Sequence, residues 1–183
     1  MCRTLSGFPT TCLERAKELK TRLGTLLQKP DPGRLPGSRK RSKEGNCSNA
    51  LRWRESFDAL LSDPSGVAAF HAFLKTEFSQ ENLEFWLACE GFKKIQCRAK
   101  REAQAHCIFQ EFVSCEAPKE VNLDHETREL TRAGLQATPG TCFDVAQAKT
   151  RVLMEKDSYP RFLRSPAYQD LAARACPPPP SQS

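Results

Sequence analysis

The feature that most constrains the fold is the spacing of the apolar residues between positions 49 and 174. They recur every three or four residues, as on one face of an α-helix, and no alternating run is long enough for a β-strand. Pro and Gly residues break this pattern into short segments. We therefore predict an all-α fold, an antiparallel helical bundle of about eight or nine helices joined by short connections.

Capping residues and turn signals indicate where the helices begin. Ser79 can cap a long helix that ends near Ile95, and Asp157 or Ser158 can open a short one. The other predicted helices are one that starts at Ser48 or Asn49 and carries Leu51 to Leu61, and those over 67–74, 100–115, 125–135 (capped by Asp124), 143–154 and from Pro166 onward.

Residues 1–29 have a different character from the bundle. Apolar residues over 11–28 follow one helical stripe. Its opposite face carries the cations Arg15, Lys17, Lys20 and Arg22. This combination is typical of an amphipathic helix that targets an anionic membrane surface. The alternative is that the stripe packs onto the bundle.

Charge divides the chain in the same way. Residues 1–49 hold eleven Lys and Arg against four Asp and Glu, whereas residues 50–183 hold seventeen against eighteen. The near-neutral second part argues against nucleic-acid binding, which requires cations on the domain itself. We predict a flexible basic linker over 30–48, a helical domain over 49–174 and a Pro-rich tail over 175–183.

The sequence lacks the usual local signatures of catalysis and metal binding. It has nine cysteines but no C-x-x-C pair, and no apolar signal core follows the N-terminus, so we expect reduced thiols and no structural zinc. No nucleophile elbow, phosphate-cradling loop or zinc-protease motif is present. No run approaches the roughly 18 apolar residues of a membrane span. We therefore expect no cofactor, no metal and no intrinsic catalysis.

Three polar clusters lie at predicted helix ends or connections. They are Glu77–Asn82, Lys119–Asn122 and Leu153–Arg161, and each combines carboxylates or amides with a hydrophobe. Side chains at such places are held in position by the scaffold but still reach solvent. The clusters are therefore candidates for binding another molecule.

These clusters and their surroundings resemble the regulators of G-protein signalling (RGS). The matching segments occur in the family's order and spacing: Phe73–Ser79, Glu81–Glu90, Glu116–Asp124 and Leu153–Leu163. The resemblance covers about 53–173, and residues 1–5 and 8–17 look like the N-terminus of the small members of the family.

The resemblance implies the helical fold of the family and a GTPase-activating function toward heterotrimeric Gα subunits of the Gi and Gq classes. Gα already carries an arginine finger and a water-orienting glutamine, so what it lacks is rigidity in its switch loops. A surface that binds the transition state more tightly than the GTP-bound ground state accelerates hydrolysis without catalytic residues of its own. The alternative function is a membrane-bound helical adaptor that occupies Gα or an effector without accelerating hydrolysis.

The resemblance also implies which residues contact Gα. Asn122 would reach toward the water-orienting glutamine, and Asp157, oriented by Arg161, would accept backbone N–H groups of a switch. The complete implied set is Glu77, Phe78, Ser79, Glu81, Asn82, Glu120, Asn122, Leu153, Lys156, Asp157, Ser158 and Arg161.

Several members of this set also have structural interpretations. Ser79 and Asp157 are good N-caps, Glu81 suits the first turn of a helix, and Arg161 is of a type common on surfaces. Asn122 is of a type common in turns.

The family's properties further imply S-palmitoylation at Cys2 and Cys12, which with a basic helix supplies the two signals that durable anchoring requires. Cys89 is a further candidate, although in the middle of a helix it also suits the role of a small buried hydrophobe. We expect a monomer in the cytoplasm, peripheral on the inner face of the plasma membrane.

Overall fold

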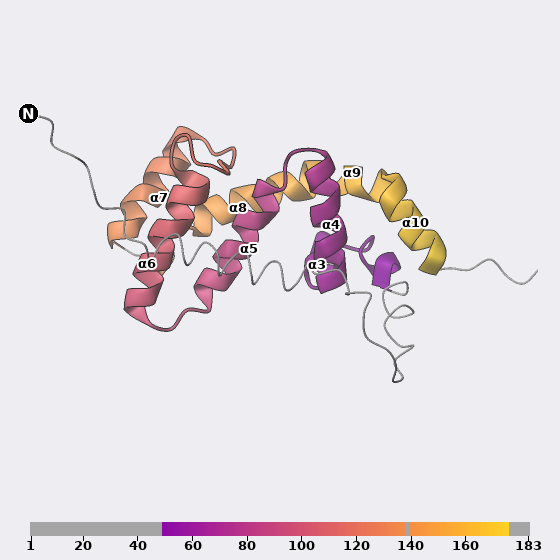
Figure 1. Cartoon of the computed structure of the whole chain (residues 1–183), viewed down its shortest axis with the longest axis horizontal. Helices are drawn as coiled ribbons and strands as arrows, with labels where there is room; N and C mark the ends of the chain where they lie inside the picture. Colours follow the sequence, from indigo (N-terminus) through magenta and orange to yellow (C-terminus); the bar gives the residue numbers. More distant parts are fainter. Residues whose placement is uncertain (1–48, 138–139, 176–183) are drawn as a thin grey trace, which may run out of the picture. The chain divides into compact units, whose positions relative to one another are not determined.

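The computed structural model describes residues 49–137 and 140–175, and all regular structure in these ranges is helical (Figure 1). The all-α prediction is thereby confirmed. The elements are α3 (Phe57–Leu61), α4 (Pro64–Thr76), α5 (Glu81–Lys93), α6 (Arg98–Ile108), α7 (His125–Ala137), α8 (Asp144–Leu153), α9 (Tyr159–Arg164) and α10 (Pro166–Ala175), with the π-helical turns η1 (Phe109–Val113) and η2 (Met154–Ser158).

Three predicted segments lie wholly or mostly outside the described residues: the amphipathic segment 1–29, the linker 30–48 and the tail 175–183, of which only Ala175 is described, as the last residue of α10. Within the described ranges, none of the helices combines the length and apolar character that crossing a membrane requires.

The first predicted helix is divided in two. Residues 49–52 are helical, a turn follows at 53–55, and α3 starts only after Ser56, whose hydroxyl accepts a hydrogen bond from the Ala59 N–H at 3.0 Å. The turn lets Trp53 enter the core, where its indole N–H donates to Asp63 at 2.9 Å. The prediction of one continuous helix to Leu61 is therefore wrong, because a local cap and a buried indole favour the break.

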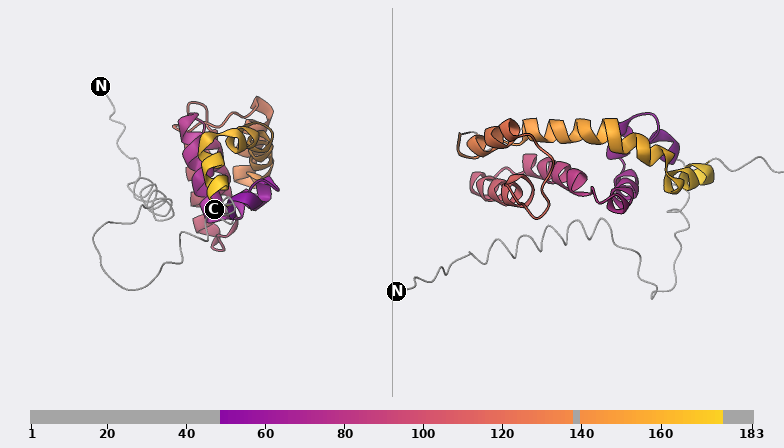
Figure 2. Two further views of the ribbon diagram at one scale, coloured as in Figure 1. Left: turned by 90° about the vertical axis from the view of Figure 1, so that its right-hand side faces the viewer. Right: turned by 90° about the horizontal axis from the view of Figure 1, so that it is seen from above.

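The helical run from α8 to α9 is continuous, as the right-hand view of Figure 2 shows. We predicted that Asp157 or Ser158 opens a new helix, but both residues lie inside η2. Ser158 has right-handed helical backbone angles and makes no capping bond. The chain widens instead into a π turn, in which the Tyr159 N–H donates to the Met154 carbonyl. Such turns are frequent at functional sites.

The core consists of two hydrophobic clusters that share helix α5. Leu83 belongs to a cluster with residues of α3, α4, α9 and α10, while Phe85, Cys89 and Phe92 belong to a second cluster with residues of α6, η1 and α8. Burial against both clusters fixes the position and rotation of α5.

Cys89 lies in the second cluster and is fully buried, and this burial raises the pKa of its thiol far above the ordinary value. Its surroundings are those of a small buried hydrophobe.

Two tyrosines attach the start of the domain to its last helices. The Tyr159 hydroxyl donates to the Trp53 carbonyl at 2.6 Å, and the buried Tyr168 hydroxyl donates to the Ala50 carbonyl at 3.0 Å. Each bond joins residues more than a hundred positions apart in the sequence. The first turn of the domain is thereby held to both α9 and α10.

Two glycines lead to opposite predictions for the same substitution. A methyl group at Gly91, on the exposed face of α5, would meet no atom within 4 Å, whereas one at Gly66 would lie 2.6 Å from the Leu60 carbonyl oxygen. Gly91→Ala should raise the free energy of unfolding by about 0.5–1 kcal/mol through helix propensity. Gly66→Ala should lower it by about 1–3 kcal/mol through overpacking. Urea unfolding of both variants measures this, and a destabilised Gly91→Ala variant would contradict the described packing of α5.

Candidate protein-interaction site

Helix α4 ends in a tight reversal that depends on an unusual residue. The Ser79 N–H donates to the Leu74 carbonyl at 3.0 Å, and the Phe78 N–H donates to the Lys75 carbonyl at 3.4 Å. These two bonds form a Schellman motif, in which the residue after the C-cap adopts the left-handed conformation and is usually glycine. Here that residue is Phe78, with φ of 53°.

Phe78 combines this conformation with near-complete exposure. The left-handed region costs a residue with a side chain about 1–2 kcal/mol, and a bulky residue there is an outlier. The residue is 90% exposed, so no packing within the described domain compensates for the conformation. Strained residues of this kind cluster at functional sites. The reversal therefore displays an aromatic ring to solvent at a conformational cost.

The start of α5 leaves polar groups without partners. The N-cap is Gln80, and its side chain makes no capping bond. The prediction that Ser79 caps this helix is wrong, because the reversal places Ser79 one position before the cap. Among the described residues, Ser79 Oγ, Gln80 Oε1 and Asn82 Oδ1 are buried and have no hydrogen-bond partner.

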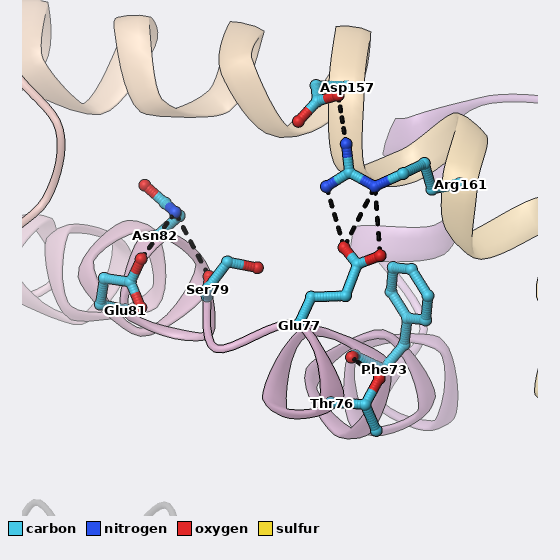
Figure 3. A network of polar contacts seen from close by, with 8 residues as sticks. All are labelled: Phe73, Thr76, Glu77, Ser79, Glu81, Asn82, Asp157 and Arg161. Carbon is cyan, nitrogen blue, oxygen red and sulfur yellow. Dashed lines mark hydrogen bonds and ion pairs between the residues drawn. The ribbon is translucent and has the colours of Figure 1, made fainter.

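Asn82 illustrates how these groups are held. It is 8% exposed, and its Nδ2 donates to the Ser79 carbonyl at 3.3 Å and to Glu81 Oε1 at 3.1 Å (Figure 3). Both donated bonds fix the amide, so its oxygen has a defined direction. A buried acceptor without a donor costs about 1–3 kcal/mol, which a binding partner that supplies an N–H or O–H would recover.

The first and third polar clusters meet through Arg161. Its guanidinium donates to both oxygens of Glu77 at the end of α4, the closest contact being 2.8 Å from Nη2, and its Nη1 donates to Asp157 (Figure 3). These bonds raise the pKa of Arg161 above its ordinary value, with the bond to Glu77 as the first cause. The predicted pairing of Arg161 with Asp157 is present, and Glu77 is a second partner that the sequence did not indicate.

The other members of the third cluster face different sides of the helix. Lys156, Asp157 and Leu153 are exposed, whereas Ser158 is 5% exposed. The helix thus presents a hydrophobe and a cation around Asp157, and Ser158 contributes mainly to the interior.

Asn122, in the second cluster, lies at the tip of a very tight turn. The Leu123 N–H donates to the Val121 carbonyl at 2.9 Å, which makes Asn122 the central residue of a γ-turn. Val121 and Leu123 are 1% and 7% exposed, and Asn122 between them is exposed. Two buried anchors therefore hold the exposed amide outward.

Side chains on both sides brace this turn. Glu120 accepts from Arg128 of α7 at 2.6 Å and from the Glu116 N–H at 3.0 Å, so both of its oxygens already have partners in the loop. Asp124 accepts from the Thr127 N–H at 2.9 Å and from Lys149 of α8 at 2.7 Å. The predicted cap on α7 is confirmed.

These contacts also act on the charge of Asp124. The hydrogen bond from Lys149, with those from Thr127, holds the pKa of the Asp124 carboxyl well below its usual range. The carboxylate therefore stays ionised at neutral pH and continues to join the start of α7 to α8.

A chain of ionisable side chains connects the same loop to the interior. Buried His71 of α4 contacts Glu84 Oε1 of α5 at 2.9 Å, and Glu84 Oε2 contacts the Lys119 ammonium at 2.7 Å. Lys119 also contacts Glu111 of η1 at 3.0 Å. The bond from His71, with that from Lys119, lowers the pKa of the Glu84 carboxyl to about 2 in spite of its burial.

The structure thus joins the first and third clusters directly through Arg161, and ties the second cluster to α5 through Lys119. Motif reasoning did not identify the bracing roles of Glu84, Lys119 and Arg128. The Lys119–Glu84 pair links distant segments, so only the opposite charges of its members were visible in the sequence. Among the described residues, no group of three or more His, Cys, Asp or Glu side chains could hold a metal ion.

Comparison with known proteins agrees with this arrangement of motifs. Residues 56–171 match the family described as the Regulator of G protein signaling domain. The chain is 67% identical to regulator of G-protein signaling 16 from Sus scrofa, with 96% of this chain and 92% of the relative covered. The human protein of that name is 66% identical over 96% and 91%. Regulator of G-protein signaling 5 from Bos taurus is 48% identical over 93% and 99%. The resemblance is confirmed, and the chain belongs to the regulator of G-protein signaling family.

Proposed function

We propose that the chain is a GTPase-activating protein for heterotrimeric Gα subunits of the Gi and Gq classes, and so shortens signalling from G-protein-coupled receptors. Family membership supports this function. The observation that carries it is the start of α5, where strained, exposed Phe78 stands beside the unpartnered oxygens of Ser79, Gln80 and Asn82. Such a surface gains free energy when another molecule supplies donors and an apolar contact.

The proposed mechanism requires no catalytic residue on this chain. Gα supplies the arginine finger and the glutamine that orients the attacking water. A rigid surface that holds the switch loops in their transition-state arrangement lowers the barrier, provided that it binds this arrangement more tightly than the ground state. The bracing around Asn122 and Asp157 supports such rigidity.

Individual residues receive roles within this proposal. Asn122 presents an amide that can donate and accept beside the glutamine of Gα. The oxygen of Asn82 accepts from one switch, and Asp157, with its second oxygen free of the Arg161 bond, accepts backbone N–H groups of another. Phe78 and Leu153 supply the apolar contacts, and Glu77, Ser79, Glu81, Glu120, Lys156, Ser158 and Arg161 shape or hold the rim.

Two amide deletions test this site. Asn122→Ala and Asn82→Ala should each reduce the acceleration of single-turnover GTP hydrolysis by a Gi-class Gα about tenfold or more, since each leaves a buried group of the partner unsatisfied at a cost of about 1–3 kcal/mol. Gln96→Ala is the matched control, because Gln96 is an exposed amide between α5 and α6. Thermal unfolding of each variant separates lost contacts from lost structure. Full acceleration by the folded Asn122→Ala, Asn82→Ala double variant would show that this surface is not the site of activation.

We also propose that residues 1–29 tether the protein to anionic lipid on the inner face of the plasma membrane, with S-palmitoylation at Cys2 and Cys12 as a second anchor. The support is the sequence pattern, an apolar stripe opposite a cationic face. The near-neutral charge of residues 50–183 fits this proposal, because the attraction to anionic lipid then comes from the basic N-terminal segment.

Matched charge removals in the full chain test the tether. Replacing Lys17, Lys20 and Arg22 by Gln should lower partitioning onto vesicles that contain phosphatidylserine by roughly a hundredfold, at about 1 kcal/mol per cation near the surface. In the control variant, Gln replaces Arg39, Lys40 and Arg41 of the linker. Its partitioning onto these vesicles should decrease much less. Equal losses in sedimentation with vesicles would mean that general basicity, and not the helix, attracts the membrane.

A further inference from the structure

His71 is a buried ionisable side chain for which the proposed function has no use. It lies on α4 with a side-chain exposure of 6%, and its partner Glu84 on α5 has an exposure of 11%. An ionised carboxylate only accepts hydrogen bonds, so the imidazole must donate its Nε2–H to Glu84 at 2.9 Å. A polar pair at this depth requires continued pairing, because an isolated charge there is costly.

We propose that His71 is a positioning residue for the loop that carries Asn122, and that it acts through Glu84 and Lys119. This inference rests on the proposed function, since it concerns how the Asn122 loop of the proposed Gα-binding surface is oriented. His71 itself lies inside the domain and touches neither Asn122 nor, in this proposal, the partner.

The Glu84 carboxylate interacts with a different side chain at each of its oxygens. Oε1 accepts the hydrogen bond from His71, and Oε2 forms an ion pair with the Lys119 ammonium at 2.7 Å. With one partner at each oxygen, the carboxylate plane has a single orientation. Removing the imidazole donor would leave Oε1 unpaired in a buried place, and the carboxylate would rotate to bring this oxygen to water, which moves Oε2 out of its contact with Lys119.

Lys119 lies between two carboxylates. Its ammonium contacts Glu84 at 2.7 Å and Glu111 at 3.0 Å, and it lies 5.5 Å from the centre of the Phe112 ring. A displaced Glu84 changes the balance of this attraction, so the ammonium moves toward Glu111. The side chain of Lys119 then no longer holds the loop to α5.

Backbone hydrogen bonds lead from Lys119 to the tip of the loop. The Lys119 N–H donates to the Glu111 carbonyl at 3.1 Å, and the Val121 N–H donates to the Phe112 carbonyl at 2.9 Å. These bonds immediately precede Asn122 and set where its γ-turn begins. A loosened Lys119 therefore changes the direction of the Asn122 amide while the helices remain folded.

The part of the site around Asp157 supplies an internal reference. Asp157 is held by Arg161, which also binds Glu77. Among the described residues, these three side chains share no hydrogen bond with the series of paired side chains His71, Glu84, Lys119 and Glu111. Loss of His71 should consequently weaken the contribution of Asn122 to the acceleration of GTP hydrolysis and leave the contribution of Asp157 unchanged.

Two substitutions at His71 in the full chain test the proposal. His71→Phe preserves a ring without a donor, and His71→Gln restores an N–H near the position of Nε2. His71→Phe should reduce the acceleration of GTP hydrolysis by a Gi-class Gα about tenfold, as expected when a binding group is misplaced by a fraction of an ångström to an ångström. His71→Gln should recover most of it. Unchanged acceleration in folded His71→Phe, or no recovery in His71→Gln, would overturn the proposal.

A double-mutant cycle distinguishes positioning from general destabilisation. Combined with Asn122→Ala, His71→Phe should cause almost no further loss of acceleration, because the group that His71 positions is already absent. Combined with Asp157→Ala, His71→Phe should reduce the acceleration by the same factor as it does alone. Equal further losses in both combinations would mean that His71 supports the whole domain and does not aim this loop.

Hydrogen exchange provides a measurement that does not depend on Gα. The Lys119 and Val121 amides should exchange about tenfold faster in His71→Phe than in the wild type and in His71→Gln, since local opening of the loop becomes easier. Unchanged exchange would overturn the proposed positioning even if the variant affects hydrolysis. If exchange changes as expected but the wild type does not accelerate hydrolysis, the positioning stands and the proposed function fails.

Discussion

Helix α5 packs against both hydrophobic clusters, and this double contact determines the geometry of the candidate site. Leu83 faces one cluster while Phe85 and Cys89 face the other, so α5 can neither rotate nor slide without opening a cavity. Asn82 and Glu84 lie on the same helix and inherit its fixed position. From there Asn82 holds its amide just beneath the surface, and Glu84 holds the loop of Asn122 through Lys119. One packed helix thus sets the direction of two separate amides.

The residues around the start of α5 include several features that lower the stability of the domain. A glycine would suit the reversal at Phe78, and a serine or aspartate N-cap would suit the start of α5, where Gln80 makes no capping bond. Buried oxygens at Ser79 and Asn82 find no partner in the described part of the chain. Each departure costs about 1–3 kcal/mol, and all of them occur within five consecutive residues, Phe78 to Asn82. Binding of a partner that supplies the missing contacts would recover this energy.

Local signals in the sequence predicted the helices, and long-range contacts account for what they missed. Periodicity indicated α4, α5 and α8, and Asp124 was correctly identified as a cap, because both signals act within one or two turns of the chain. The break before α3 combines the local Ser56 cap with the burial of Trp53, and the bond from Tyr159 to the Trp53 carbonyl is a tertiary contact at the end of the continuous run through η2. The site residues were named by family motif alone. That Glu77 shares Arg161 with Asp157 became visible only when distant segments were brought together.

In the proposed mechanism this surface prefers the transition state of Gα and is not merely a place where Gα binds. The most direct measurement compares the affinity of the full chain for a Gi-class Gα loaded with GDP and aluminium fluoride, which mimics the transition state, and with a non-hydrolysable GTP analogue. We expect the protein to bind the first complex at least about a hundredfold more tightly than the second. Equal affinities would contradict this expectation and would identify the protein as a helical adaptor that occupies Gα without accelerating hydrolysis.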